Sequence, residues 1–221
     1  MPGLTRGLSI KWILKTQGRV GFARWALRSI PYHLWLHLTP QGRRDLNFDS
    51  RHSVVTEGIT WPEAQCAVHY APVQPYRFRH ALAQLPVDFP RFTFMDVGCG
   101  KGRPLIMAKE YSFRRILGVE VSETLVGIAG QNAPHAEVVC ANALAFEFPP
   151  EDSVIYMFNP FRDPVMGAFI ARLEESLMLL PRAVWIVYSP FFSRALDASP
   201  MFTRTHLEPG RLAVYRSRSN P

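Results

Sequence analysis

The sequence predicts an α/β fold, with a doubly wound, Rossmann-like and mostly parallel sheet that ends in a C-terminal antiparallel hairpin. Three observations support this prediction. Apolar, β-prone stretches alternate with helical stretches between residues 92 and 188. Gly98, Gly100 and Gly102 stand directly between the first of these strands and the next helix. The last part of the chain alternates around Glu208-Pro209-Gly210, as a hairpin does.

Helices and strands are expected to alternate regularly in the second part of the chain. The expected elements are a short helix at 76–85, strands at 92–96, 115–121, 137–140, 153–158 and 183–188, and hairpin strands at 201–206 and 211–217. The run at 115–121 is nearly continuously apolar, which is typical of a strand covered on both faces. The helices between the strands are expected to begin at Pro104, Ser122 and Asp163, because these residue types favour the first turn of a helix.

The composition limits the class of protein that the chain can form. With 221 residues, 48% hydrophobic and only 19% charged, the chain can bury one full core and is not expected to be disordered. It has no run of about 18 apolar residues, so no transmembrane segment is expected. The three cysteines, Cys66, Cys99 and Cys140, lack C-x-x-C spacing and the histidines are scattered. This pattern predicts no metal site and a reducing, cytoplasmic setting.

The net charge of +7 is concentrated at the start of the chain. Residues 1–44 contain eight Lys and Arg and no Asp or Glu, whereas the other 177 residues contain 17 basic and 18 acidic side chains. Basic and apolar residues recur at helical spacing between Leu8 and Leu38, which predicts one or two basic amphipathic helices. Contact with an anionic membrane, nucleic acid or an acidic partner remains open, as do packing on the chain's own domain and an organelle transit peptide.

These features predict a chain of two parts. Residues 1–75 are expected to form a basic helical extension and a cover loop, because turn-forming residues are frequent from Gln41 to Pro75. Residues 76–221 are expected to form the ligand-binding domain. A loop that precedes such a domain can cover the ligand, so Tyr70 is a candidate to reach the site.

The central motif is Phe-Thr-Phe-Met-Asp-Val-Gly-Cys-Gly-Lys-Gly-Arg at residues 92–103. Glycines so spaced remove every Cβ from one side of the turn, so the backbone can approach a nucleotide-type ligand closely. The dinucleotide fingerprint requires Gly or Ala where this chain has Arg103, which disfavours a nicotinamide-dependent oxidoreductase. Cys99 is expected to fill space in the turn, and Lys101 and Arg103 are expected to face solvent.

Three further polar side chains, Glu120, Asn142 and Asn159, follow predicted strands. Ligands of open α/β sheets bind at the carboxyl ends of the strands, where these residues and Asp96 are expected to meet. A carboxylate at Glu120 can accept both hydroxyls of a ribose. The alternatives are that Glu120 only stabilises the N-terminus of the next helix, and that Asn142 is only a turn residue.

The turn at residues 96–102 resembles motif I of the class I methyltransferases that use S-adenosylmethionine (SAM). From residue 76 to the C terminus, the order of elements also resembles this family. The resemblance implies SAM as the cofactor, bound by Asp96, Gly98, Cys99, Gly100, Gly102, Glu120 and Asn142. It implies that Glu120 holds the ribose and that Asn142 lies near the adenine. Asp96 would meet either the backbone amides of the turn or the amino group of the methionine part.

Asn159-Pro160-Phe161 resembles the Asn/Asp-Pro-Pro-aromatic motif of methyltransferases that modify amino or amide nitrogens, with one proline missing. The resemblance implies a catalytic role. The Asn159 carbonyl and the backbone oxygen at Pro160 would orient the N–H bonds of the acceptor, and Phe161 would lie against it. An Asn-Pro turn before a capped helix is the alternative.

Two looser resemblances concern the same motifs. The glycine turn, Gly118-Val119-Glu120 and the Asn-Pro-Phe sequence are similar to those of uncharacterised bacterial methyltransferase-like proteins. Asn-Pro-Phe together with residues 188–192 is similar to non-SET protein-lysine methyltransferases.

The sequence therefore predicts an enzyme that transfers a methyl group from SAM to an unidentified acceptor, with the nitrogen of a protein lysine or a small-molecule amine favoured. Two alternatives stay open. One is the nicotinamide-dependent oxidoreductase. The other is a non-catalytic module with a SAM-binding fold that docks on RNA or an anionic membrane through residues 1–44.

Overall fold

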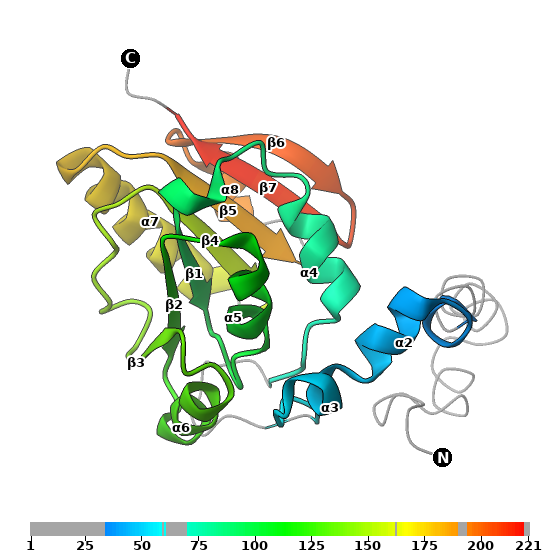
Figure 1. Cartoon of the computed structure of the whole chain (residues 1–221). Helices are drawn as coiled ribbons and strands as arrows, with labels where there is room; N and C mark the ends of the chain where they lie inside the picture. Colours follow the sequence, from blue (N-terminus) through cyan, green and yellow to red (C-terminus); the bar gives the residue numbers. More distant parts are fainter. Residues whose placement is uncertain (1–33, 59, 61–69, 162, 190–193, 219–221) are drawn as a thin grey trace, which may run out of the picture. The chain divides into compact units, whose positions relative to one another are not determined.

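The computed structural model describes residues 34–58, 60, 70–161, 163–189 and 194–218 (Figure 1). The amphipathic helices predicted between Leu8 and Leu38 lie almost entirely outside these residues, as do Cys66 and the segment 190–193. The chain divides into two compact units, residues 1–51 and residues 52–221. Within the described residues, no helix is both long enough and apolar enough to cross a membrane.

The described part of the first unit is helical. Residues 34–38 are helical, α2 spans Pro40–Leu46, and α3 spans Phe48–His52 at the boundary of the two units. The expectation of irregular chain from Gln41 onward is therefore wrong for these helices. The signal that was missed is Thr39-Pro40. Thr39 Oγ1 accepts the Gly42 N–H at 2.9 Å, and proline at the first helical position lacks only an N–H that would have no helical partner.

The second unit is built on a seven-stranded sheet, which confirms the predicted fold class. Its strands are β1 (Thr93–Val97), β2 (Arg115–Glu120), β3 (Glu137–Cys140), β4 (Ser153–Phe158), β5 (Val184–Ser189), β6 (Phe202–Glu208) and β7 (Leu212–Ser217). Their order in the sheet is β3-β2-β1-β4-β5-β7-β6. All neighbours are parallel except β7, which runs antiparallel to both β5 and β6.

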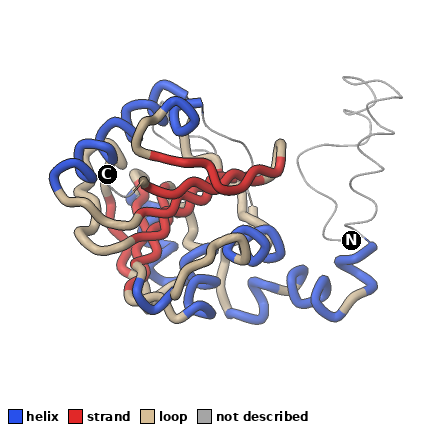
Figure 2. The backbone as a smooth tube through the Cα atoms, turned by 90° about the horizontal axis from the view of Figure 1, so that it is seen from above, coloured by secondary structure: helices blue, strands red, loops and turns tan. Residues whose placement is uncertain are grey.

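Helices cover both faces of this sheet (Figures 1 and 2). One face carries α4 (Pro75–Leu82), α5 (Arg103–Ala108) and α6 (Glu123–Asn132), with 3-10 turns at Phe89–Arg91 and Lys109–Tyr111. The other face carries α7 (Asp163–Leu179) and α8 (Arg194–Ala198). The predicted cap of α6 is present, because Ser122 Oγ accepts the Leu125 N–H at 3.4 Å.

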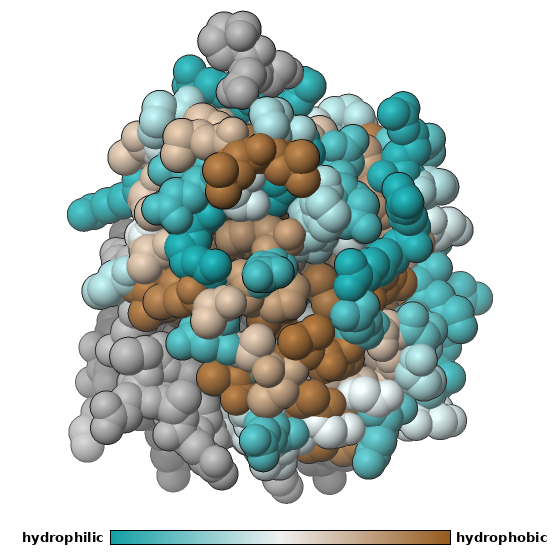
Figure 3. All heavy atoms as spheres, turned by 90° about the vertical axis from the view of Figure 1, so that its left-hand side faces the viewer, coloured by the Kyte–Doolittle hydropathy of each residue, from teal (hydrophilic) through white to brown (hydrophobic). Residues whose placement is uncertain are grey.

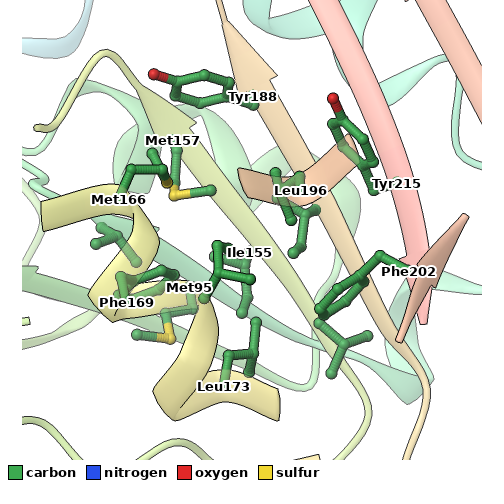
Figure 4. Close-up of a cluster of buried hydrophobic side chains, with 14 of the residues drawn as sticks. Met95, Ile155, Met157, Met166, Phe169, Leu173, Tyr188, Leu196, Phe202 and Tyr215 are labelled. Carbon is green, nitrogen blue, oxygen red and sulfur yellow. The ribbon is translucent and has the colours of Figure 1, made fainter. Parts of the chain in front are cut away.

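The two faces of the sheet carry different cores. Toward α7 and α8 the core is mainly aliphatic and sulfur-containing, and Met95 and Met157 of the sheet pack there beside the helix residues (Figure 4). Toward α4 and α5 it is aromatic. The ring of Phe78 lies edge-on to those of Phe94 and Tyr156, with centroids 5.8 and 5.1 Å apart. Burial on both faces explains why the central strands are almost continuously apolar.

Some apolar side chains of the second unit remain on the surface. The face in Figure 3, which is the left-hand side of Figure 1, carries hydrophobic groups interspersed with hydrophilic ones. Leu179 is 87% exposed and Met178 is 63% exposed, both at the end of α7. Because α7 leads into the start of β5, this exposed end lies at the edge of the sheet opposite the carboxyl ends of the parallel strands.

Candidate functional site

A pocket opens at the carboxyl ends of β1 to β4, where the strand order reverses. The chain runs outward from β1 to β3 and returns on the other side of β1 at β4, so the loops after β1 and β4 leave the sheet in opposite directions. The space between them measures about 1220 Å³, open mouth included. All the predicted site residues except Gly102 line it, together with Tyr70, Ala71, Val73, Pro104, Val119, Val121, Leu125, Ala141, Ala143, Phe158 and Val165.

The glycine turn after β1 has a backbone conformation that favours glycine. The φ angle is +74° at Gly98 and +55° at Gly100. Other parts of the chain also approach both positions closely. An added Cβ would lie 2.9 Å from Pro160 Cβ at Gly98 and 2.1 Å from Cδ2 of Tyr70 at Gly100. The turn therefore lies against the segment after β4 at one glycine and against Tyr70 at the other.

Glu120 organises the turn through both oxygens of its carboxylate. Oε2 accepts the Gly100 N–H at 3.0 Å, and Oε1 accepts the N–H groups of Val121 and Ser122 at 2.9 and 3.0 Å. Glu120 therefore contacts the two residues that precede α6, as its alternative role at the start of this helix requires. A carboxylate has about four acceptor positions and three are used, so capacity for a ligand hydroxyl remains on Oε2.

Asp96 is a buried carboxyl that borders the pocket. The residue is 1% exposed, and its Oδ2 has no hydrogen-bond partner among the described residues. Burial raises the pKa of Asp96 well above its usual range, and the nearby Glu120 raises it further. A buried acceptor beside an open pocket is expected to pair with a ligand donor, and an ammonium group would supply both the hydrogen bond and the compensating charge.

Cys99 fills space in the turn, as the sequence predicts. It is 2% exposed, and an added Cβ at Gly118 of β2 would lie 2.9 Å from its Sγ. Burial raises the pKa of the Cys99 thiol, and Asp96 and Glu120 raise it further, so the thiolate that a nucleophilic role needs is disfavoured. In the part of the chain that the structure describes, no three His, Cys, Asp or Glu side chains are grouped to hold a metal ion.

The two asparagines that border the pocket differ in their surroundings. Asn142 is exposed, and its Oδ1 accepts the Leu144 N–H at 2.9 Å, so the turn role is present. Asn159 has a left-handed backbone with φ +52°, and its N–H donates to the Ser189 carbonyl at 2.9 Å. Such a conformation is uncommon outside glycine and is concentrated at functional sites. Phe161 packs its ring against Phe169 of α7, with centroids 5.6 Å apart.

Arg103 is the clearest disagreement between expectation and structure. We expected it to face solvent, but it is 3% exposed. Its guanidinium donates to Thr56 Oγ1 at 2.6 Å and pairs with Glu57 Oε1 at 2.7 Å. The expectation is wrong because a segment more than 40 residues earlier in the chain lies over the start of α5, which no local pattern reveals.

The sequence interpretation also missed the apolar lining of the pocket. Val121 and Phe158 stand directly beside the predicted site residues Glu120 and Asn159, so their positions were available as a signal. Leu125 lines the pocket from the first turn of α6. Together they make much of the pocket wall apolar, as is usual for small-molecule sites.

Residues 94–178 match the family model described as a methyltransferase domain, which covers the region from β1 to α7. This region contains the glycine turn, Glu120, Asn142 and Asn159. No curated protein sequence matches the chain significantly.

Many solved structures share the fold. A putative RNA methyltransferase from Pyrococcus horikoshii is 16% identical and has a TM-score of 0.51, with 80% of this chain and 100% of that chain covered. TrmN from Thermus thermophilus is 17% identical and has a TM-score of 0.52, with 66% and 49% covered. A predicted N6-adenine-specific DNA methylase from Listeria monocytogenes is 13% identical and has a TM-score of 0.52, with 67% and 52% covered. At these identities the likeness concerns the fold.

Proposed function

We propose that this chain, which carries a SAM-dependent methyltransferase domain, transfers the methyl group to the nitrogen of a protein lysine or a small-molecule amine. The observation that carries the proposal is the left-handed turn at Asn159, which borders the same pocket as the glycine turn. Gly98 and Pro160 are packed so closely that an added Cβ would clash, so the donor and acceptor sides of the pocket adjoin. When bound, SAM supplies a methyl group made electrophilic by its sulfonium.

The residues at the glycine turn fit this cofactor. Oδ2 of Asp96, buried without a partner among the described residues, is suited to the amino group of the methionine part. Glu120 borders the pocket and retains acceptor capacity for a ribose hydroxyl. Asn142 and the apolar side chains of Val121 and Leu125 also line the pocket, and we assign them to the adenine.

The acceptor is proposed to enter beside Asn159. The amide oxygen of Asn159 and the backbone oxygen of Pro160 accept the N–H bonds of a neutral amine, which leaves its lone pair free for attack. A nitrogen–carbon bond forms, the sulfur–carbon bond breaks, and the nitrogen then releases one proton to solvent. Asp96 and Glu120, the carboxylates that line the pocket, both belong to the proposed donor side. Among the described residues, the acceptor side therefore offers no carboxylate to pair with an ammonium group or to take its proton, which favours an acceptor that arrives neutral.

The charge distribution within residues 45–221, which contain the proposed site, favours an amine over a nucleic acid as acceptor. Residues 45–221 contain 17 basic and 18 acidic side chains, so this part of the chain has no excess positive charge to hold a phosphate backbone. Methyltransferases with the same fold that are named for RNA or DNA share too little sequence with this chain to transfer their acceptor to it.

The test is incubation with methyl-labelled SAM and an extract separated into protein, nucleic-acid and small-molecule fractions. We expect label in the protein or small-molecule amine fraction. Asn159→Gly keeps the left-handed backbone and removes only the amide, so turnover should fall about tenfold or more while the affinity for S-adenosylhomocysteine (SAH) stays within about twofold. Asn47→Gly, at the exposed C-cap of α2, is the matched control and should keep full turnover. Label in nucleic acid, or unchanged turnover in Asn159→Gly, would contradict the proposal.

A further inference from the structure

A segment that precedes the sheet in sequence lies against the glycine turn. This segment, here called the strap, comprises residues 55–58, 60 and 70–73. The backbones of Thr60 and Tyr70 pair between its two halves, with N–H to carbonyl distances of 3.2 and 2.8 Å. Tyr70, Ala71 and Val73 of the strap line the pocket. The strap therefore contributes one wall of the proposed cofactor site.

Arg103 joins the strap to the start of α5. Its Nε donates to Thr56 Oγ1 at 2.6 Å, its Nη2 pairs with Glu57 Oε1 at 2.7 Å, and its Nη1 donates to the Val73 carbonyl at 3.4 Å. One buried guanidinium thus holds both halves of the strap. Thr56 is fully buried, whereas the Glu57 side chain is 66% exposed, so these contacts run from the interior to the surface.

Two neighbours of the turn support the same attachment. Lys101 Nζ donates to the Glu57 carbonyl at 2.8 Å and lies 5.4 Å from the centroid of the Tyr70 ring. Asn132, at the end of α6, donates to the carbonyls of Val55 and Lys101 and accepts the Val55 N–H. The strap is therefore bonded to α5, α6 and the turn itself.

Tyr70 links these contacts to the pocket. Its hydroxyl donates to the Thr56 carbonyl at 2.9 Å, and its ring covers Gly100 so closely that an added Cβ there would lie 2.1 Å from Cδ2. Thr56 thus accepts from Arg103 through its side chain and from Tyr70 through its backbone. A ligand over the glycine turn would lie beside this ring.

We propose that Arg103 is a positioning residue that, through Thr56, holds the Tyr70 ring over the glycine turn and so slows the release of SAM and SAH. The inference rests on the proposed function, because it requires SAM to bind over the turn. Arg103 itself is absent from the pocket lining, so it acts through Tyr70 and touches no reacting atom.

The test is the rate of SAH dissociation, measured by stopped-flow displacement on the full chain. Arg103→Gln and Tyr70→Ala should each speed dissociation about tenfold, and the double variant should be no faster than Tyr70→Ala alone, because both changes release the same ring. Arg115→Gln is the matched control. It removes an exposed arginine that pairs with Glu137, and its rate should stay within about twofold of wild type.

The double variant separates positioning from a general structural role. If the two effects on the rate multiply, or if Arg103→Gln lowers the melting temperature and leaves SAH release unchanged, the inference is overturned. Should Arg103→Gln not fold, Glu57→Gln removes only the exposed partner of Arg103 and should speed release about twofold to threefold. An unchanged rate there would overturn the inference as well. A wild type that binds no SAH would overturn the cofactor assignment itself.

Discussion

The proposed donor and acceptor sides of the pocket are built differently. The donor side is organised by hydrogen bonds and buried carboxyl groups: Glu120 accepts three backbone N–H groups, and Asp96 is 1% exposed. The acceptor side offers the amide of Asn159 among apolar side chains, and Phe161 packs its ring against α7. We therefore expect the proposed donor side to be specific for its ligand, and the proposed acceptor side to constrain its ligand much less. Substitutions should follow this division, with donor-side changes altering SAH affinity and acceptor-side changes altering turnover.

The largest effect on the donor side is expected for Glu120→Gln. A glutamine has the same shape but only one side-chain oxygen, so its NH₂ would face a backbone N–H and leave at least one buried donor unpaired. Losing charge-assisted bonds to the turn and to the ribose should weaken SAH binding roughly 100-fold. Isothermal titration with SAH measures this. Glu137→Gln, which removes an exposed carboxylate that pairs with Arg115, is the control.

The proposed division into donor and acceptor sides would be contradicted if Glu120→Gln bound SAH as tightly as wild type. A loss of unfolding free energy of about 1–3 kcal/mol with unchanged SAH affinity would mean that Glu120 only supports the turn and the start of α6. Measuring both quantities on one preparation distinguishes the two interpretations of this residue.

Asp96→Asn is expected to weaken SAH binding less than Glu120→Gln does, and at the same time to raise the stability of the ligand-free protein. Burial and Glu120 raise the pKa of Asp96 in the folded protein. The stability contribution of such a group is present below the unfolded pKa of about 3.9 and is lost as pH rises through the raised folded pKa. Asparagine does not ionise, so the variant should gain unfolding free energy over wild type with rising pH, reaching roughly 0.5–2 kcal/mol at pH 7.5.

The same substitution should weaken SAH binding about tenfold, because the ligand ammonium loses its charged partner. Thermal melts of the ligand-free protein between pH 5 and 8, together with SAH titrations, measure both effects. Asp88→Asn, at an exposed carboxyl, should change neither. A variant that is less stable than wild type at pH 7.5 would show that the ionised Asp96 has partners that compensate its burial.

The fold and most of the pocket could be predicted because they depend on short-range patterns. The strands at 137–140 and 153–158 have the bounds that their composition indicates. Parallel strands of one sheet end at the same edge, so residues that follow different strands, such as Glu120 and Asn159, had to come together once the sheet was inferred. No contact between them needed to be known in advance.

The features that the sequence did not predict depend on long-range contacts or on one overlooked cap. An arginine beside a glycine turn is normally expected to face solvent. The burial of Arg103 is explained by distant partners, among them Thr56, which lies 47 residues earlier. The helix α2 was missed because turn-forming residues outweighed the Thr39-Pro40 start signal. The sequence made Tyr70 a candidate to reach the site, and Tyr70 does line the pocket. Its packing on Gly100 was not predicted, because the two residues are 30 positions apart and periodicity carries no information about such pairs.

The smallest donor-side effect is expected for Asn142→Ala. The Asn142 side chain is exposed and its Oδ1 already accepts the Leu144 N–H, so its contribution to the adenine should be worth only about threefold in SAH affinity. Asn142→Asp keeps an acceptor for both the turn and the adenine amino group, and should bind SAH within about twofold of wild type. SAH titrations of Asn142→Ala and Asn142→Asp measure both affinities. If Asn142→Ala alone lowered the SAH affinity more than about tenfold, Asn142 would contribute as much to donor recognition as Asp96. The adenine end of the proposed donor site would then be as specific as its methionine end.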